Sequence, residues 1–150
     1  MTLSQRPPTA VPFRETRWDN RRVDYTVQWG GAAEDVLICY RGTPAADAMA
    51  GSFRMVRGAP EYRDGLRILL DYRAVDWDSL YGAEMRQIAE AFNGLPPTSH
   101  RHRVASVVDQ KVAYGLLRIV QAHINEHQIK TQGNFFYDFE SAHAWLNEGT

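Results

Sequence analysis

The feature that most constrains the fold is residues 66–80, where a nearly continuous apolar run ends in an acidic loop. An apolar run without polar alternation is typical of a strand that is buried on both faces of a parallel sheet. The loop places Asp78 and Ser79 directly before a helical pattern, and these residue types are common helix N-caps. The stretch therefore predicts a central strand at residues 66–72 that delivers the chain to a helix N-terminus.

A β-hairpin is expected before this strand. Tyr25, Val27 and Trp29 alternate with polar residues, which predicts a half-buried strand, and residues 36–40 form an apolar second strand after a glycine turn. On an open edge of the sheet, Tyr25 and Trp29 would support a homodimer, whereas burial in the core explains the same alternation. Both explanations stay open at this point.

The remaining elements alternate between strands and helices. Two more apolar strands are expected downstream, at residues 104–108 and around residues 135–137. Helices with one apolar stripe are expected to start near polar residues that can cap them: Thr43, Asp78 or Ser79, Asp109 and Asp138. The order β-β-α-β-α-β-α-β-α predicts an α/β fold with a mixed, mostly parallel sheet of about five strands, an N-terminal β-hairpin and about four helices.

The chain length fits one domain that is preceded by an arm. The 150 residues suffice for one hydrophobic core. Residues 1–20 contain three prolines and few aliphatic side chains, so they predict a flexible N-terminal arm, and the domain is expected over residues 21–150. No apolar run approaches the roughly 20 residues that span a bilayer, and no secretory pattern is evident. A cytoplasmic location without an integral membrane segment is therefore expected.

Charge and cysteine content exclude several classes of protein. The 17 basic and 18 acidic residues leave no field that would attract nucleic acid, so no nucleic-acid partner is expected. The single cysteine, Cys39, lies in an apolar strand pattern and is expected to be a small buried hydrophobe. The sequence has no glycine-rich phosphate loop, paired-cysteine metal site or serine-hydrolase motif, so neither a cofactor nor a catalytic residue is predicted.

The candidate binding site lies at the strand-end loops. Ligands of open α/β sheets usually meet the loops beyond the carboxyl ends of the strands. The residues predicted to bind a ligand or partner combine aromatic, acidic, hydroxyl and basic side chains: Asp76, Trp77, Asp78, Ser79, Tyr81, Tyr114 and Arg118. Aromatic side chains of this kind can line a pocket, and they also suffice to fill a core.

Several segments resemble one known family. The run Ile-Leu-Leu-Asp-Tyr-Arg at residues 68–73, the segments at residues 104–108 and 114–118, and the aromatic strand at residues 135–140 before Ala-His-Ala-Trp-Leu at residues 142–146 carry the resemblance. They resemble the small bacterial SpoIIAA-like proteins, also described as STAS-like or STAS/SEC14-type domains. The resemblance covers roughly residues 23–146 and implies a single STAS-type α/β domain. It implies less about activity, because a fold does not fix a function.

The resemblance implies two kinds of role. In anti-sigma-factor antagonists, a serine in an Asp-Ser-Ser-Gly-Leu loop at a helix N-terminus is phosphorylated, which switches partner binding. The corresponding loop here reads Asp-Ser-Leu-Tyr-Gly at residues 78–82, with Leu80 at the usual phosphorylated position. Ser79 is the candidate phosphorylation site, while helix capping by Asp78 and Ser79 is favoured. The SEC14-type branch implies instead an apolar small molecule held between sheet and helices.

One enzyme alternative stays open. His123 and His127 in the pattern His-x-x-Glu-His have the spacing of an inverted zinc-peptidase site, but such a site needs a third protein ligand in a small domain. No metal site is therefore predicted. Loop carboxylates such as Asp76 could act as acid and base if burial separated their pKa values. The favoured function is a non-enzymatic STAS-like domain, a candidate regulator, that binds a protein partner or a small apolar or anionic ligand.

Overall fold

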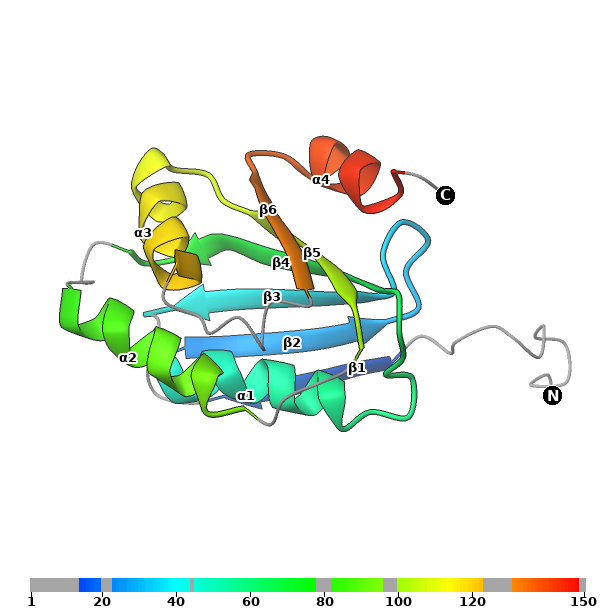
Figure 1. Cartoon of the computed structure of the whole chain (residues 1–150), viewed down its shortest axis with the longest axis horizontal. Coiled ribbons are helices and arrows are strands. Elements are labelled where there is room, and N and C mark those ends of the chain that lie inside the picture. Colours follow the sequence, from blue (N-terminus) through cyan, green and yellow to red (C-terminus); the bar gives the residue numbers. More distant parts are fainter. Residues whose placement is uncertain are drawn as a thin grey trace, which may run out of the picture.

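A mixed sheet of six strands organises the part of the chain that the structure describes (Figure 1). The computed structural model describes residues 14–19, 23–43, 45–77, 82–95, 100–122 and 131–148. The strands follow one another across the sheet in chain order: β1 (Arg14–Asp19), β2 (Val23–Trp29), β3 (Val36–Gly42), β4 (Leu66–Val75), β5 (His102–Val107) and β6 (Thr131–Phe136). The first three strands pair in antiparallel fashion, and β3 to β6 are parallel. The apolar β4 is therefore an interior strand, as its sequence predicts.

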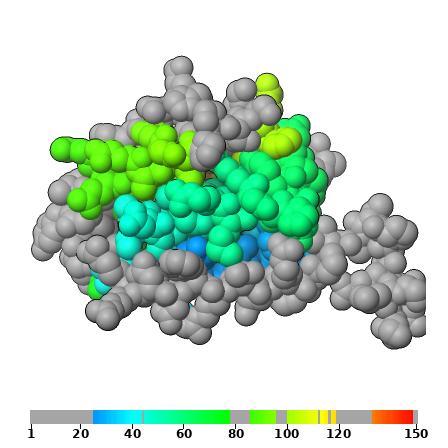
Figure 2. Space-filling model, turned by 90° about the horizontal axis from the view of Figure 1, so that it is seen from below, coloured from blue at the N-terminus to red at the C-terminus, as the bar shows by residue number. Residues whose placement is uncertain are grey.

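Four helices of the described residues cover the two faces of the sheet: α1 (Ala46–Arg57), α2 (Gly82–Asn93), α3 (Lys111–Ala122) and α4 (Phe139–Leu146). Ile68 and Leu70 of β4 lie in one cluster with side chains of α1, α2 and α3. Leu69, between them, lies in a second cluster with Ala142 and Leu146 of α4. Because successive side chains of a strand point to opposite faces, α4 covers the face opposite to the other three helices. On the first face, α1 and α2 lie side by side (Figure 2).

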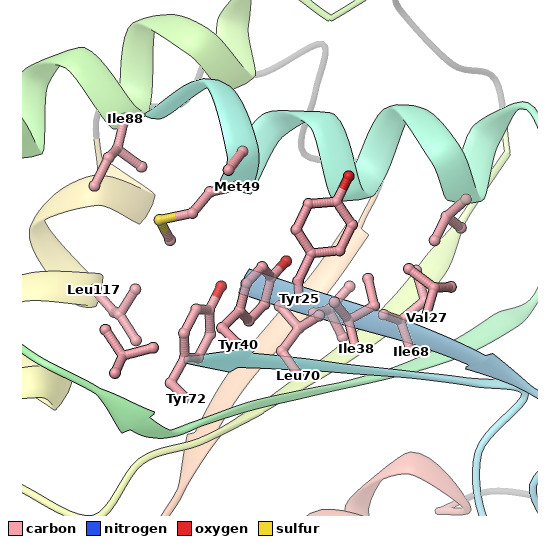
Figure 3. Packing of buried hydrophobic residues seen from close by; sticks show 14 of the residues in the cluster. Tyr25, Val27, Ile38, Tyr40, Met49, Ile68, Leu70, Tyr72, Ile88 and Leu117 are labelled. Atoms are coloured by element: carbon pink, nitrogen blue, oxygen red, sulfur yellow. The ribbon is translucent and has the colours of Figure 1, made fainter. Parts of the chain in front are cut away.

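The large core on the first face contains tyrosines whose hydroxyls are satisfied internally (Figure 3). The rings of Tyr40 and Tyr72 stack with centroids 4.9 Å apart and planes 5° apart. The Ser52 hydroxyl donates to the Met49 carbonyl at 2.6 Å, so the Tyr40 hydroxyl, 2.5 Å from Ser52 Oγ, donates to Ser52. Burial raises the pKa of both Tyr40 and Tyr72 above its ordinary value. These hydroxyls therefore remain neutral parts of the core.

The strand β1 corrects the predicted flexible arm. The sequence places residues 1–20 in that arm, but residues 14–19 form β1, which pairs with β2 along its whole length. The prediction was wrong for these six residues because an edge strand gains its hydrogen bonds from one neighbour and needs little aliphatic sequence. Charged residues are common on edge strands, where they discourage pairing with other chains. The sheet thus has one strand more than the five expected.

The apolar side chains that alternate with polar ones in β2 could lie in the core or form an exposed dimer surface, and their burial decides between these explanations. Tyr25 and Trp29 are each 2% exposed, and Val27 between them is buried to the same degree. Burial in the core therefore explains the pattern, and a homodimer built on the exposed side chains of Tyr25 and Trp29 is excluded.

The sequence predicts the N-cap of α4 correctly and the N-cap of α1 wrongly. Asp138 is the N-cap of α4, as predicted, and accepts a hydrogen bond from the Ser141 N–H at 2.7 Å. The predicted cap at Thr43 was wrong, because α1 begins at Ala46 and the chain first turns out of β3 at Gly42, whose φ is 91°. Among the described residues, no helix is both long and apolar enough to cross a membrane.

Candidate functional site

The carboxyl ends of the parallel strands meet at one edge of the sheet, where the sequence predicts the site. Backbone hydrogen bonds continue past the strand ends. The Asp76 N–H donates to the Gly42 carbonyl at 2.9 Å, and the Val108 N–H donates to the Phe136 carbonyl at 2.9 Å. These bonds hold the loops in register, so the side chains that follow the strands have defined positions.

The acidic loop after β4 turns its tryptophan inward. Asp76 is exposed, whereas Trp77 is 3% exposed and its ring centroid lies 5.7 Å from that of Tyr72. In the described part of the chain, the buried indole N–H of Trp77 has no hydrogen-bond partner. Packing the indole against Tyr72 removes a large apolar surface from water, which outweighs that loss. Trp77 therefore packs in the core, and its predicted role in binding a ligand or partner stays a prediction.

Several predicted site residues lie outside the described residues. These are Asp78, Ser79 and Tyr81, together with the two histidines of the zinc-peptidase pattern, His123 and His127. The predicted roles of the first three in helix capping, phosphorylation and ligand binding stay predictions, and metal binding by the two histidines stays an open alternative. Within the ranges that the structure describes, no group of three or more His, Cys, Asp or Glu side chains could hold a metal ion.

Tyr114 and Arg118 come together with a third residue, Tyr137, to form what we call the aromatic edge. Tyr114 of α3 is half-buried, and its ring centroid lies 5.7 Å from that of Tyr137 with an angle of 20° between the planes. The ring of Phe135 of β6 packs against the ring of Tyr114, with centroids 5.4 Å apart. The Arg118 guanidinium carbon lies 5.9 Å from the Tyr114 ring centroid. Two predicted site residues are thus neighbours on one helix.

Tyr137 is a candidate contact residue that the sequence did not reveal. The sequence predicts it inside a strand centred on residues 135–137, but β6 ends at Phe136 and Tyr137 is 51% exposed. Among the described residues it is the exposed large hydrophobic side chain, whereas the other described aromatic side chains are buried or half-buried. The available signal was its place directly before Asp138, because a residue preceding an N-cap lies outside both elements.

The charged residues beside the aromatic edge are engaged in structural contacts. Asp71 accepts a hydrogen bond from Arg73 Nε at 3.0 Å, which raises the pKa of Arg73. The Arg73 guanidinium carbon also lies 4.3 Å from the ring centroid of Phe139. At the start of α4, the backbone and hydroxyl of Ser141 donate to Asp138 and lower the pKa of that carboxyl. Asp71 and Asp138 therefore hold the local structure of β4 and of the start of α4.

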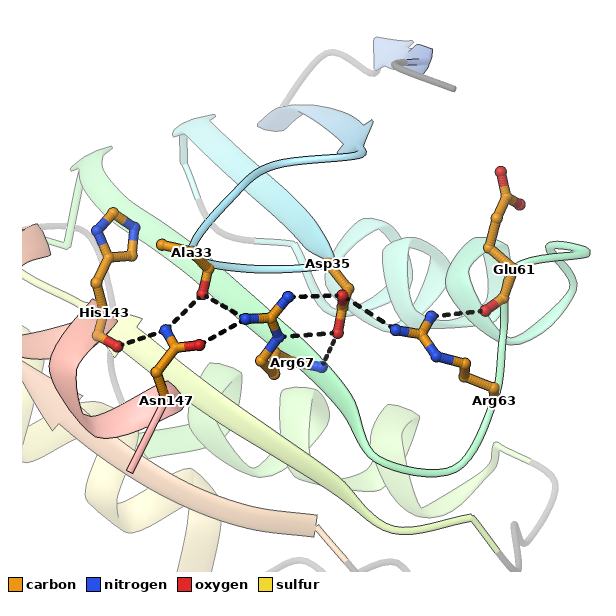
Figure 4. Close-up of polar contacts among 7 residues, drawn as sticks. All are labelled: Ala33, Asp35, Glu61, Arg63, Arg67, His143 and Asn147. Carbon is orange, nitrogen blue, oxygen red and sulfur yellow. Dashed lines mark hydrogen bonds and ion pairs between the residues drawn. The ribbon is translucent and has the colours of Figure 1, made fainter. Parts of the chain in front are cut away.

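A polar network at the opposite edge of the sheet fixes α4 (Figure 4). Arg67 of β4 donates through Nη2 to Asp35 at 2.9 Å and through Nη1 to the Asn147 side chain at 2.6 Å. Asn147 donates in turn to the carbonyls of Ala33 at 2.9 Å and His143 at 2.8 Å. Burial acts to raise the pKa of Asp35, but the hydrogen bonds and charge of Arg67 outweigh it and lower that pKa. The network holds the C-terminal end of α4, whose other end adjoins Tyr137.

The described residues form an α/β fold with one mixed sheet, and Tyr137, which stacks on Tyr114, is exposed at the carboxyl edge of the parallel strands. Comparison of the chain with models of known protein families, with curated proteins and with solved structures finds no match.

Proposed function

We propose that this chain is a non-enzymatic STAS-like domain that binds a protein partner through the aromatic edge. The observation that carries the proposal is Tyr137, which is 51% exposed while its ring is stacked on Tyr114. A tyrosine held in this way presents apolar area and a hydroxyl at little cost in side-chain entropy. Tyrosine and arginine, the residue types of the aromatic edge, are enriched at the centres of protein interfaces.

The STAS-like assignment is supported by the alternation of strands and helices from β3 onward and by the aromatic β6 that leads into α4. A small apolar or anionic ligand is the alternative occupant of the same edge. The protein partner is favoured because Tyr137 is exposed and the exposed Arg118 lies near the same Tyr114 ring on which Tyr137 stacks, an arrangement that suits a second protein surface.

Photo-cross-linking tests this proposal in cells that produce the chain. A photoreactive amino acid in place of Tyr137 is expected to give one discrete adduct with a protein. The same amino acid at Gln87, which is exposed on α2, serves as the control and is expected to give none. Arg118→Glu should remove the adduct at position 137 while circular dichroism shows an unchanged fold. Equal labelling at both positions, or no protein adduct at position 137, contradicts the proposal.

A further inference from the structure

The exposed face of α3 is basic. Lys111, Gly115 and Arg118 are all exposed and follow one another at helical spacing, so they lie along one face of the helix. α3 contains no acidic residue. We call these three residues the α3 stripe; it adjoins the aromatic edge and shares Arg118 with it.

The exposed face of α4 is acidic. Glu140, Ala144 and Glu148 are exposed at successive fourth positions along α4 and the turn that follows it, and we call them the α4 stripe. The exposed face of α2 differs, because Arg86 and Glu90 place both signs one helical turn apart. Charge is therefore separated between α3 and α4, whereas it is balanced on α2.

Two of these charges, on Lys111 and Glu148, oppose the dipole of their own helix, whereas Glu140 in the first turn of α4 favours it. Lys111 is the first residue of α3, and Glu148 follows the last residue of α4. The helix dipole favours negative charge at an N-terminus and positive charge at a C-terminus, so both residues oppose it. Lys111, Glu140 and Glu148 form no ion pair with any described residue of the chain. Their charges are available for a contact with another molecule.

The middle of each stripe permits a close approach. A Cβ atom added to Gly115 would meet no atom within 4 Å, so packing inside the chain does not require glycine there. Glycine is unfavourable in a helix interior, and without a side chain it lets another backbone approach closely. Ala144 takes the corresponding middle position of the α4 stripe, between its two glutamates.

We infer that the protein bound at the aromatic edge is a second copy of this chain, whose α4 stripe docks on the α3 stripe of the first. This inference rests on the proposed function, because it names the partner of that surface. Lys111 and Arg118 face Glu140 and Glu148 of the second copy, and Gly115 faces Ala144. Since α3 and α4 lie on opposite faces of the sheet, the contact is heterologous and joins copies head to tail.

Charge reversal tests the inference on the full chain by sedimentation velocity over a range of protein concentrations. The wild type is expected to associate reversibly, and more weakly as salt increases. Lys111→Glu with Arg118→Glu, and separately Glu140→Lys with Glu148→Lys, should each give monomers. An equimolar mixture of these two variants should associate again, because each reversed stripe then meets its opposite. Arg86→Glu with Glu90→Arg is the matched control on α2 and should associate like the wild type.

Three outcomes overturn the inference: a wild type that is monomeric at every concentration in low salt, a reversed variant that still associates like the wild type, or a mixture that stays monomeric while thermal unfolding shows both variants folded. A monomeric wild type that still gives a discrete adduct with a different protein at position 137 overturns the inference alone. A monomeric wild type without any protein adduct at position 137 overturns the proposed function as well.

Discussion

The two faces of the sheet are stabilised in different ways. The face under α1, α2 and α3 buries a large cluster of aromatic and aliphatic side chains. The face under α4 buries a smaller cluster: Leu69, Ala105, Val107, Ala142 and Leu146. Around that smaller cluster, Arg67, Arg73 and Arg103 contact Asn147, Phe139 and Trp145. α4 therefore depends on hydrogen bonds and cation–π contacts for a larger share of its attachment to the sheet than the other helices do.

Leu70→Ala is expected to lower the stability of the protein the most. Leu70 is 3% exposed in the large core, so truncation should lower the free energy of unfolding by about 2–5 kcal/mol through lost burial and a cavity. Urea denaturation measures the change. The matched variant Leu146→Ala removes the same groups from the smaller cluster, where the surroundings can relax more, and should fall at the low end of that range. A larger loss of unfolding free energy for Leu146→Ala than for Leu70→Ala would contradict the difference between the two faces.

Arg67→Ala should have the next largest effect, since it removes the side chain that joins Asp35 in the loop before β3 to Asn147 at the end of α4, while the hydrogen bond from Asn147 to Ala33 remains. It should lower the free energy of unfolding by about 1–3 kcal/mol, because Asp35 and Asn147 lose hydrogen bonds in a half-buried setting. The pKa of Asp35 is lowered on folding, so this contribution is present above pH 3.8 and is lost as the pH falls below it. The control Arg63→Ala removes a half-exposed partner of Asp35 and should cost less than about 1 kcal/mol. Equal effects of the two variants contradict the role assigned to Arg67.

His102 of β5 is expected to make the stability of the protein depend on pH, because its side chain is buried, with 5% exposed. Burial, followed by the charges of Arg57 and His100, lowers the pKa of His102 from 6.5 to about 4, while Asp64 acts in the opposite direction. Between these pH values the unfolded chain binds more protons than the folded chain, so stability should fall as the pH drops from 6.5 towards 4.

Urea denaturation at a series of pH values checks this expectation about His102. His102→Gln removes the titrating group and should flatten the pH dependence in that window. The same slope in both proteins would show that another group is responsible.

Arg103→Gln has the smallest expected effect. The Arg103 guanidinium carbon lies 4.2 Å from the ring centroid of Trp145, and loss of this cation–π contact should cost about 0.5–1 kcal/mol. Faster amide hydrogen exchange should be confined to α4. Faster exchange spread equally over α1 would mean that the two faces do not differ in the way described.

The order of elements from β2 onward could be predicted from periodicity, because burial imposes a repeat of two on strands and of about 3.6 on helices. The strand β1 could not, since its charged sequence is shaped by an edge position and has no apolar pattern. Arg67 contacts Asp35, which is 32 positions away in the sequence, and Asn147, which is 80 positions away. No local sequence pattern predicts such pairings.

The aromatic residues of the site were the hardest to place from sequence. The alternation of side chains between the faces of a strand stops where the strand ends, so a misplaced strand end changes which aromatic residue is expected to be buried. β4 extends to Val75, three residues beyond the predicted end, and the following Trp77 packs into the core. β6 ends at Phe136, before the predicted end, and Tyr137 is left exposed.

Hydrogen exchange tests most directly whether a second molecule covers α3 and the aromatic edge. Amides of α3 should exchange more slowly in concentrated than in dilute protein, whereas amides of α2 should exchange at the same rate in both. The variant with Lys111→Glu and Arg118→Glu should lose this concentration dependence. Equal exchange of α3 at both concentrations, or equal slowing of α2 and α3, contradicts a contact on this surface.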